Sequence, residues 1–551
     1  MNSLNNIQIN HSNKIISAFF LIILIIGSFT FTDYGISIDE EFQRSSGYYW
    51  LSYVLDFTNL NELKIEVKNE YNNIKGFTLL SPETIPFYGI IFDLPLAFIE
   101  TFFNIENSRN YFFLRHWVNF FIFFISSIFC YRLLLNRFNI FYVSFLGTIF
   151  YVLSPRLYGS SFYNNKDTLF LSLVTIAIYY CFKSLDKHSY KNLIIFAIIS
   201  AICTSTRIIG IFIPISFILI YFLSAISQNR YFRDIYKILF YLAAYYFFLV
   251  LHWPFLWEAP LKNFILLFGS TDQLLVNMKV MFNGTYYDSN LLPYYYVPIW
   301  IAVSTPVIHL IFFFPGFFYI FKRSFSRFIN IKEKSNFSDF WRGDAEKKDF
   351  YILFNFLICL LYVVFIHKNF FNGWRHIYFL NIFLIYFSTY GFYLIYNNSK
   401  TVIKKTILFL LVFLMLSLLT TRMIIYHPYQ NIYFNFLVND EVKKGFDIDY
   451  NGLSGISFLK KILANNKDKK IIVSVASYLP LERSLALLKK NDRNRIKIVG
   501  QEYLISDYIF TNNISEVNKN FDNKYNIPKK FIKVDELFID GAQLYKVYKK
   551  N

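Results

Sequence analysis

The sequence predicts an all-α polytopic membrane protein with a small C-terminal α/β domain outside the membrane. Hydrophobic residues make up 55% of the chain and charged residues only 17%, below the roughly 25% usual in soluble domains. A membrane-spanning helix needs roughly 20 mostly apolar residues, and about eleven runs approach that length. These runs are 15–32, 110–135, 139–156, 167–183, 191–206, 208–226, 235–253, 295–321, 350–367, 375–396 and 404–426.

Lys and Arg are distributed unevenly between the loops that join these runs. With eleven spans, five basic loops fall on one face together with the N-terminus. They contain Arg132 and Arg137; Lys183, Lys187 and Lys191; Arg230, Arg233 and Lys237; Lys322, Arg323, Arg327, Lys332 and Lys334; and Lys400, Lys404 and Lys405. Because cytoplasmic loops are enriched in Lys and Arg, this face is predicted to be cytoplasmic. The same loops explain the net charge of +18, and no nucleic-acid-binding motif accompanies it.

The opposite, extracytoplasmic face is expected to carry the long segments. A transmembrane domain over 1–426 has a first outer loop at 33–109 and a second at 254–294, and an extracytoplasmic α/β domain follows at 427–551. Within the first loop, the apolar stretch 86–103 predicts a helix at the membrane surface. In the C-terminal domain the pattern predicts strands at 470–474, 495–499 and 544–548 and a helix at 481–490.

Several basic residues are predicted on this outer face, although Lys and Arg are usually enriched on the cytoplasmic face and scarce on the opposite one. They are Arg115, His116, Arg156, Lys166, Arg207, Lys368, Arg375, His376 and Arg422, with His252, His367 and His427 nearby. Ionisable groups at helix ends are costly unless they reach the interface, pair, or line a wet cavity. Cations from at least five helix ends indicate a shared anionic ligand near the outer leaflet. Independent anchoring of each residue at the interface is the alternative.

Acidic residues occur at two places on the same predicted face. Asp39, Glu40 and Glu41 follow the first apolar run, and Asp167 follows Lys166 at the start of another. A solvated acidic loop and a carboxylate stabilised by a helix N-terminus would explain each place alone. Together, acids beside a cationic cluster fit proton abstraction next to an anionic leaving group.

Further segments follow one another in order along the membrane part of the chain. They are 155–167, which ends in Asp167; Leu-Pro-Tyr-Tyr-Tyr-Val-Pro at 292–298 with Trp300 and Thr305-Pro306; Gly-Trp-Arg-His at 373–376; and His-Pro-Tyr-Gln at 427–430 with Tyr433, Phe434 and Asn435. With the acidic pair Asp39-Glu40 in the first outer loop, these segments resemble the C-type (GT-C) membrane glycosyltransferases. The group is glycosyltransferase family 39, which includes protein-mannosyltransferases and aminoarabinose transferases. The resemblance covers about residues 10–430.

The resemblance implies a GT-C-like catalytic domain that transfers a sugar from a polyprenyl-phosphate donor to an acceptor outside the cytoplasm, with inversion. Asp39 is then the candidate general base, with Glu40 as the second choice. The candidates for binding the donor phosphate are Arg207, Arg375 and His376, followed by Lys166 and Arg115. Asp167 would hold a divalent metal or orient a cation, because related enzymes differ in their use of metal.

Two other classes of protein also handle lipid-linked sugars. A transporter or flippase tends to carry ionisable residues and broken helices near the bilayer midplane, often in paired repeats. An O-antigen ligase or polymerase usually has its key residues in a large later outer loop, unlike Asp39. The enzyme interpretation places the chain in a bacterial inner membrane with a cytoplasmic N-terminus. It leaves open the sugar, whether hexose or pentose, and the glycan, lipid or protein acceptor.

Overall fold

The computed structural model of the protein describes residues 2–74, 88–187, 189–227, 231–269, 278–329, 341–366, 369–466, 470–479, 481–512 and 523–551. Two residues predicted above to carry outer charge, His367 and Lys368, lie outside these ranges, as do Arg230, Lys332 and Lys334.

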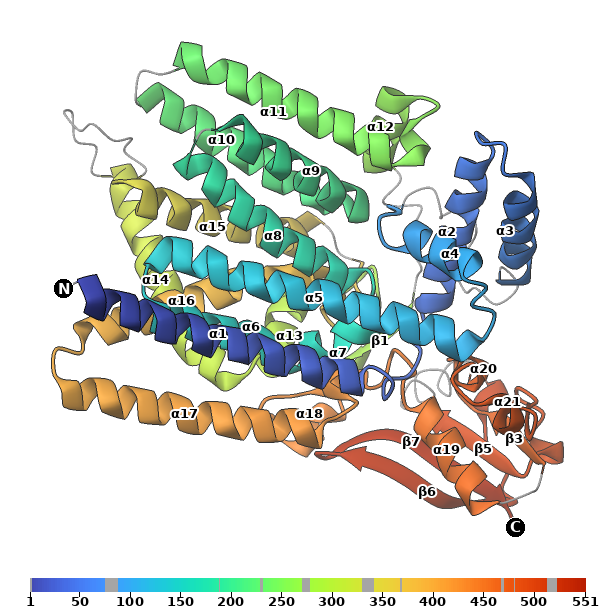
Figure 1. Ribbon diagram of the computed structural model, residues 1–551. Helices are drawn as coiled ribbons and strands as arrows, with labels where there is room; N and C mark the ends of the chain where they lie inside the picture. The colour runs from blue at the N-terminus through green and yellow to red at the C-terminus, as the bar shows by residue number, and fades with distance from the viewer. Residues whose placement is uncertain are drawn as a thin grey trace.

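Nine helices in the described part of the chain are long and apolar enough to cross a membrane, which confirms the polytopic all-α class. Figure 1 shows them side by side, with their axes roughly parallel. The bounds are α1 (Asn2–Thr30), α5 (Ser108–Phe138), α8 (Asp167–Asp186), α10 (Phe212–Ser227), α11 (Tyr231–His252), α14 (Val307–Ile329), α15 (Asp344–Leu361), α16 (Asn381–Asn398) and α17 (Val402–Ile425).

Two further apolar helices are shorter than the roughly 20 residues of a standard span. They are α6 (Phe141–Val152) and α9 (Tyr190–Thr206), and they correspond to the expected runs 139–156 and 191–206. With the nine longer helices they account for all eleven predicted runs.

The run 295–321 was expected to be one helix, and this expectation is wrong. The chain forms α13 (Tyr296–Ser304), breaks at Thr305 and continues as α14 after Pro306. Proline lacks an N–H and pushes the preceding residue out of the helical region, and Thr305 is accordingly extended. The Asn435 side chain donates to the carbonyl oxygens of Ala302 and Thr305 at 2.6 and 3.0 Å. The motif after the last span therefore stabilises this break.

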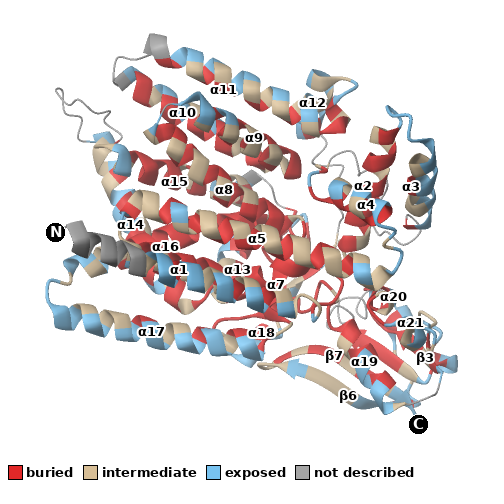
Figure 2. Cartoon of the chain, in the orientation of Figure 1, coloured by how far each residue is buried: buried red, intermediate tan, exposed pale blue. Residues whose placement is uncertain are grey.

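The interior of the bundle is formed by α8 and α16, whereas α1 and α17 expose most of their surface on its outside (Figure 2). Glycines allow α14 and α16 to pack closely. A Cβ atom at Gly316 would lie 1.9 Å from the Phe387 carbonyl oxygen, and one at Gly391 would lie 1.9 Å from that of Phe312. Such small-residue contacts are typical of helix packing in membranes.

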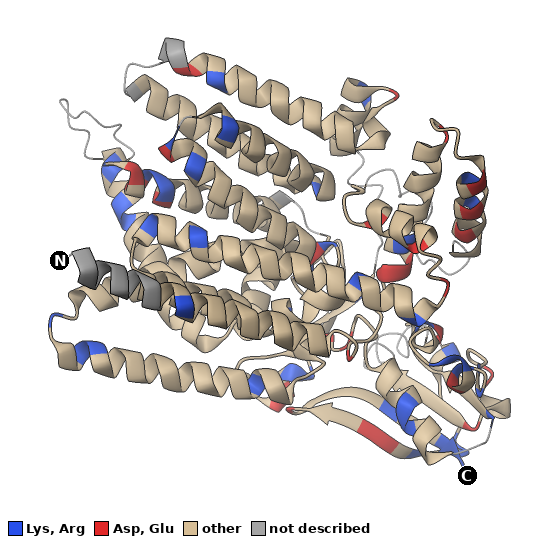
Figure 3. Ribbon diagram, viewed as in Figure 1, with Lys and Arg blue, Asp and Glu red and all other residues tan. Residues whose placement is uncertain are grey.

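The two ends of the bundle differ in charge and in attached structure. Lys and Arg gather at the end that holds the N-terminus (Figure 3). There Arg137 of α5 and Arg323 of α14 both donate to the buried Asp349 carboxylate, each at 2.6 Å. Two of the predicted basic loops therefore meet at this end. The opposite end is called the site end below.

The site end carries the two long loops. The first contains α2 (Glu40–Leu55), α3 (Asn61–Ile74) and α4 (Asp93–Phe102), which form a group beyond the bundle (Figure 1). Of the described residues of the predicted surface helix 86–103, those from Asp93 to Phe102 are helical, and residues 86 and 87 lie outside the described ranges. The second loop contains α12 (Pro260–Gly269) and a hairpin of β1 (Lys279–Phe282) and β2 (Thr285–Asp288). The short α7 (Pro155–Tyr163) precedes α8 here.

The C-terminal sheet domain also lies at the site end. Its sheet has the order β4-β3-β5-β7-β6, parallel between β3 and its two neighbours and antiparallel elsewhere. The elements are α18 (Asp440–Lys443), α19 (Gly455–Asn465), β3 (Ile471–Val475), α20 (Glu482–Leu485), α21 (Lys490–Arg493), β4 (Ile496–Ile498), β5 (Tyr508–Asn512), β6 (Phe531–Ile539) and β7 (Ala542–Lys550). The three predicted strands are confirmed as β3, β4 and β7. The helix expected at 481–490 is wrong, since two short helices stand there.

Candidate functional site

Three consecutive acids at the start of α2 have three different partners. Asp39 stands at the N-cap position, but its side chain makes no capping hydrogen bond. Its Oδ2 instead pairs with Nη1 of Arg375. Glu40 is buried, and its oxygens accept the Ser37 backbone N–H at 2.6 Å and approach Nε2 of His116 at 2.9 Å. Of the two predicted candidates for the base, only Asp39 therefore pairs with a residue predicted to bind the donor phosphate, since the partner of Glu40 is His116.

Arg375 follows a turn in which Asn372 and Gly373 both have positive φ, so the backbone reverses just before it. Its guanidinium is 5% exposed and lies between two acids. Besides pairing with Asp39, Nη1 is 4.0 Å from Oδ2 of Asp167. Arg375 therefore joins the acid of the first outer loop to the acid at the start of α8.

Asp167 is fixed from both sides at the first residue of α8. Asn164 donates to Oδ2 of Asp167 at 2.9 Å and accepts the Asp167 backbone N–H at 2.8 Å. Oδ1 of Asp167 pairs with Nη2 of Arg207, the extended residue that ends α9. A continuous chain of side-chain contacts thus runs from Asp39 through Arg375 and Asp167 to Arg207.

Lys166 lies beside this chain of contacts and adds a third positive charge when it is protonated. Its Nζ lies over the ring of Tyr88, and no described carboxylate lies within ion-pair distance of it. Burial lowers the pKa of Lys166 well below its usual range, and the charges of Arg207 and Arg375 lower it further. The charge of Asp39 acts in the opposite direction. We call Asp39, Lys166, Asp167, Arg207 and Arg375 the site cluster.

When Lys166 is protonated, the site cluster holds three cations against two carboxylates, and it leaves donors unused. The Nε atoms of Arg207 and Arg375 are buried, and no described residue accepts a hydrogen bond from either. Burial raises the pKa of Asp39, but the charge and hydrogen bond of Arg375 outweigh this effect, so its pKa lies below the usual value. The Asp39 side chain is 30% exposed and is thus an ionised carboxylate that solvent reaches. The cluster can attract an anion next to a base.

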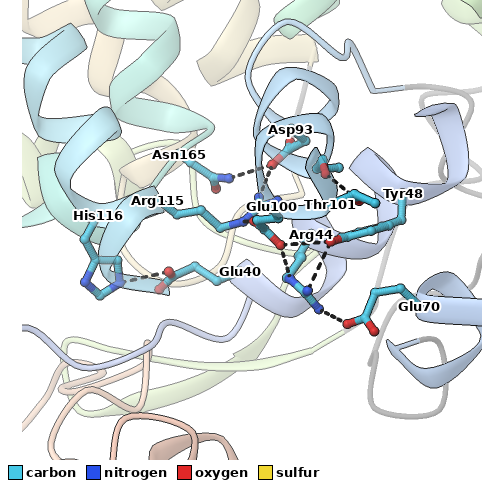
Figure 4. A network of polar contacts seen from close by, with 11 residues as sticks. Glu40, Arg44, Tyr48, Glu70, Asp93, Glu100, Thr101, Arg115, His116 and Asn165 are labelled. Carbon is cyan, nitrogen blue, oxygen red and sulfur yellow. Dashed lines mark hydrogen bonds and ion pairs between the residues drawn. The ribbon is translucent and has the colours of Figure 1, made fainter. Parts of the chain in front are cut away.

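Arg115, another predicted cation, lies in a different group of charges. Its Nη1 donates to Asp93 at 3.0 Å and its Nε to Glu100 at 2.6 Å (Figure 4). Glu100 also accepts from Arg44 at 2.7 Å, and Arg44 reaches Glu70 at 2.9 Å. We call Arg44, Glu70, Asp93, Glu100 and Arg115 the loop network. Arg115 therefore holds the first outer loop against α5.

The loop network touches the site cluster at one point. Asn165, which precedes Lys166, donates to Oδ1 of Asp93 at 3.0 Å (Figure 4). Burial raises the pKa of Asp93 to about 7, although Arg115 acts in the opposite direction. The loop that carries Lys166 and Asp167 is thus anchored to the first outer loop.

The remaining predicted cations have contacts with other residues. His376 packs its ring against Phe370 and Phe371, with centroids 6.1 and 4.7 Å apart. Arg156 donates to the Tyr433 carbonyl oxygen at 2.8 Å. The other partners are Asp540 for Arg422, Asp33 for His427 and Ser205 for His252.

Sequence analysis did not anticipate Arg483 of α20. Its Nε donates to Oε2 of Glu41 at 2.8 Å, and its Nη1 donates to the Ile38 carbonyl oxygen at 2.7 Å. The contact joins positions 442 residues apart, and no local pattern marks it. The role of Asn164 in holding Asp167 could have been considered from the sequence, because Asn164 lies in the segment 155–167, which ends in Asp167.

The described residues offer little for a metal ion. They contain no group of three or more His, Cys, Asp or Glu side chains placed to hold one. Both oxygens of Asp167 already have partners, and Asp39 pairs with Arg375. A divalent cation at these acids would have to displace guanidinium groups, so these residues do not fit a metal site.

Fold and site together define a polytopic helical membrane protein with a cation-rich, acid-containing cluster at one end of its bundle. Residues 94–257 match the family model described as dolichyl-phosphate-mannose-protein mannosyltransferase, which confirms the resemblance over this segment. The segment includes Lys166, Asp167 and Arg207. The chain is also similar to ArnT from Cupriavidus metallidurans, solved bound to undecaprenyl phosphate, with 7% identity, a TM-score of 0.42 and 97% of each chain covered. Comparison with curated proteins gives no match.

Proposed function

We propose that this protein is a membrane glycosyltransferase that moves a sugar from a polyprenyl-phosphate donor to an acceptor at the site end. The observation that carries the proposal is the site cluster: an accessible, ionised Asp39 beside Lys166, Arg207 and Arg375, of which the two arginines have unused donors. The family match over residues 94–257 supports the same class of reaction, because its description names a polyprenol-phosphate-linked sugar.

The chemistry follows from the charges. The acceptor hydroxyl attacks the anomeric carbon and gives its proton to Asp39 as the new C–O bond forms. The bond from the anomeric carbon to the phosphate oxygen breaks, and its electron pair stays on the phosphate. Attack opposite to the leaving group inverts the anomeric carbon.

The leaving polyprenyl phosphate gains negative charge as that bond breaks. Arg375, Arg207 and Lys166 are fixed in a poorly hydrated place, where each cation stabilises this charge more than it would in bulk water. Asp167 holds Arg207 in position and lies beside Arg375. In this mechanism Asp167 orients cations, and no step requires a metal.

The site end is proposed to face away from the cytoplasm. Within the helical bundle, Lys and Arg gather at the other end, with the N-terminus, and such enrichment is typical of the cytoplasmic side (Figure 3). The protein would then act in a bacterial inner membrane on a glycan, lipid or protein acceptor outside it. The position of the charges at a bundle end, rather than at mid-bundle, disfavours a transporter.

Mass spectrometry of lipid-linked sugars and cell-envelope glycans tests the proposal in cells with and without the gene. Loss of the gene is expected to leave a polyprenyl-phosphate sugar unused and to remove the corresponding sugar mass from one acceptor. Identical profiles in the two strains, with the protein present in the membrane of one of them, would contradict the proposal.

A further inference from the structure

The C-terminal sheet domain touches the first outer loop on both sides of Asp39. Arg483 of α20 binds the side chain of Glu41 and the carbonyl oxygen of Ile38. Ile38 precedes Asp39 by one residue and Glu41 follows it by two. The Arg483 side chain is 6% exposed, so these hydrogen bonds are largely shielded from competing water.

A second contact fixes the same loop a few residues earlier. A Cβ atom at Gly35 would lie 2.5 Å from the Leu453 carbonyl oxygen, so the backbones of the two segments are in close contact there. The turn that presents Leu453 is itself held by Asp449, whose carboxylate accepts the Leu453 N–H at 2.9 Å. Residues 35–41 are therefore enclosed by the chain that leads into the sheet domain and by the domain itself.

We propose that Arg483 is a positioning residue, through which the C-terminal sheet domain holds the Asp39 segment in its reactive geometry. This inference rests on the proposed function, because it assumes that Asp39 is the base. A guanidinium that bonds a carboxylate and a backbone carbonyl fixes both a side chain and the main chain. The sheet domain is then part of the active enzyme, not an independent appendage.

The charge of Arg483 also acts on the two acids next to it. Burial raises the pKa of Glu41, and Arg483 opposes this rise. Arg483 is among the cations that lower the pKa of Asp39, together with Arg375 and Lys166. The other charged groups that face this position are Glu40, Asp167, Arg207 and Glu482, which raises the pKa of Glu41. Loss of the Arg483 charge would therefore raise the pKa of Asp39.

Hydrogen exchange of the full-length protein in lipid nanodiscs tests the contact without any substrate. Arg483→Gln is expected to accelerate amide exchange in peptides covering residues 34–46 by about tenfold or more, which corresponds to one charge-assisted hydrogen bond. Arg483→Lys should have a smaller effect, since it keeps the charge. Unchanged exchange in Arg483→Gln overturns the proposal, whatever the activity.

Arg493 of α21 provides a matched control. It joins the sheet domain to the bundle through Ser108 Oγ at 2.5 Å, and within the domain it donates to the carbonyl oxygens of Leu485 and Ala486, each at 3.0 Å. None of these partners is next to Asp39. Arg493→Gln should leave exchange at residues 34–46 unchanged. Equal acceleration by the Arg483 and Arg493 variants would mean general loosening of the domain and would overturn the specific role.

Kinetics then separate positioning from stability. In Arg483→Gln, kcat should fall by about ten- to a hundredfold with little change in KM, and the acidic limb of kcat/KM should move to higher pH. Arg483→Lys should recover part of kcat. Glu41→Gln should lower kcat in the same way, and the double variant should be no worse than Arg483→Gln alone. Faster exchange without any fall in kcat would overturn the proposal, whereas absence of transfer in the wild-type protein would refute the proposed function and leave the exchange result standing.

Discussion

The site cluster and the loop network are made from the same kinds of side chains, yet their charges are balanced differently. The loop network has three carboxylates, Asp93, Glu100 and Glu70, against the guanidiniums of Arg44 and Arg115. A proton on Asp93, whose pKa is raised to about 7, balances the network. It therefore has no need of an external ion.

When Lys166 is protonated, the site cluster has the opposite excess; without that proton, its two arginines and two carboxylates balance, so an incoming anion would favour the charged form of Lys166. Asp39 and Asp167 stand against the cations of Lys166, Arg207 and Arg375. No described residue close to the cluster supplies a carboxylate to balance this excess, because Glu40 pairs with His116 and Glu41 pairs with Arg483. The comparison teaches that neither buried charge nor an unused donor alone marks a site, since Nη2 of Arg115 in the loop network is also buried without an acceptor; the sign of the unbalanced charge distinguishes the two groups.

The largest expected effect is a loss of catalytic rate, and it comes from a change at Asp39 in the site cluster. Asp39→Asn removes the proposed base and keeps the size of the side chain, so kcat should fall by about 10²–10⁴-fold while the protein stays folded. Because the pKa of Asp39 is lowered, the wild-type enzyme should keep its base ionised well below neutral pH. Rates of sugar transfer by purified protein in nanodiscs, measured against pH, check both statements.

Glu62→Gln is the control for this change, since Glu62 lies in α3 of the same loop and outside both groups. It should transfer sugar at the wild-type rate. An Asp39→Asn protein that elutes normally and transfers at the wild-type rate would remove Asp39 from the mechanism.

The next largest expected effect is on the affinity of the site cluster for a lipid phosphate. Arg375→Gln and Arg207→Gln should each weaken binding of undecaprenyl phosphate by about 10–100-fold, since a hydrogen bond to a charged group contributes about 1.5–3 kcal/mol. Titration of the purified variants with this lipid phosphate, at constant detergent or nanodisc concentration, gives the Kd values. Salt should weaken wild-type binding only modestly, because Arg375 is buried.

Arg115→Gln sharpens this test, since Arg115 is a buried arginine of the balanced network. The folded fraction of this variant should bind the lipid phosphate with wild-type affinity. If Arg115→Gln weakened binding as much as Arg375→Gln, the distinction between the two groups would be wrong.

The sequence predicts those features of this arrangement that depend on residues close together in the chain. Hydrophobic length is local, so the spans could be located without the structure, and the error at 295–321 came from overlooking the effect of Pro306 on Thr305. The sidedness of the loops also brought Asp39, Lys166, Asp167, Arg207 and Arg375 to one face in the prediction. Their meeting in one cluster is a structural observation, and their chemical roles remain predictions.

The errors and gaps share one physical cause. A sequence gives the type of a side chain but not its partner, so Arg115 could not be assigned to Asp93 and Glu100, or Glu40 to His116. Arg483 was missed for the same reason, since its partner lies in a loop at the other end of the chain. Strands β5 and β6 lacked a clear alternation of apolar and polar residues and were also missed.

Within the loop network, the expected effect is on stability. Glu100 is fully buried and holds both Arg44 and Arg115, so Glu100→Gln leaves two buried guanidiniums without their shared carboxylate. The free energy of unfolding should fall by about 3–5 kcal/mol, as for other broken buried ion pairs. Glu70→Gln removes the partner of Arg44 that is 36% exposed, and it should cost no more than about 1 kcal/mol.

Thermal or denaturant unfolding in nanodiscs measures this difference, and the rate of transfer per folded molecule should stay near that of the wild-type protein in both variants. Equal stability of the Glu100 and Glu70 variants would show that the network does not support the loop. A selective loss of transfer by folded Glu100→Gln would instead move the network into the catalytic machinery.

The smallest effect is the pH dependence contributed by Asp93. Its folded-state pKa of about 7 lies above the value of about 3.9 expected in the unfolded chain, so between these values the folded protein keeps a proton that the unfolded chain has released. Stability should therefore decrease as pH rises through this window, by up to about 1.4 kcal/mol per pH unit. Asp93→Asn imitates the protonated acid, can still accept hydrogen bonds from Arg115 and Asn165, and should flatten this slope.

Unfolding measured at pH 5, 6 and 7 checks this pH dependence. The control is Asp56→Asn, a change of an exposed residue at the end of α2. If the wild-type and Asp93→Asn proteins lose stability equally with rising pH, the proton that balances the loop network lies elsewhere, and the contrast with the site cluster loses its electrostatic basis.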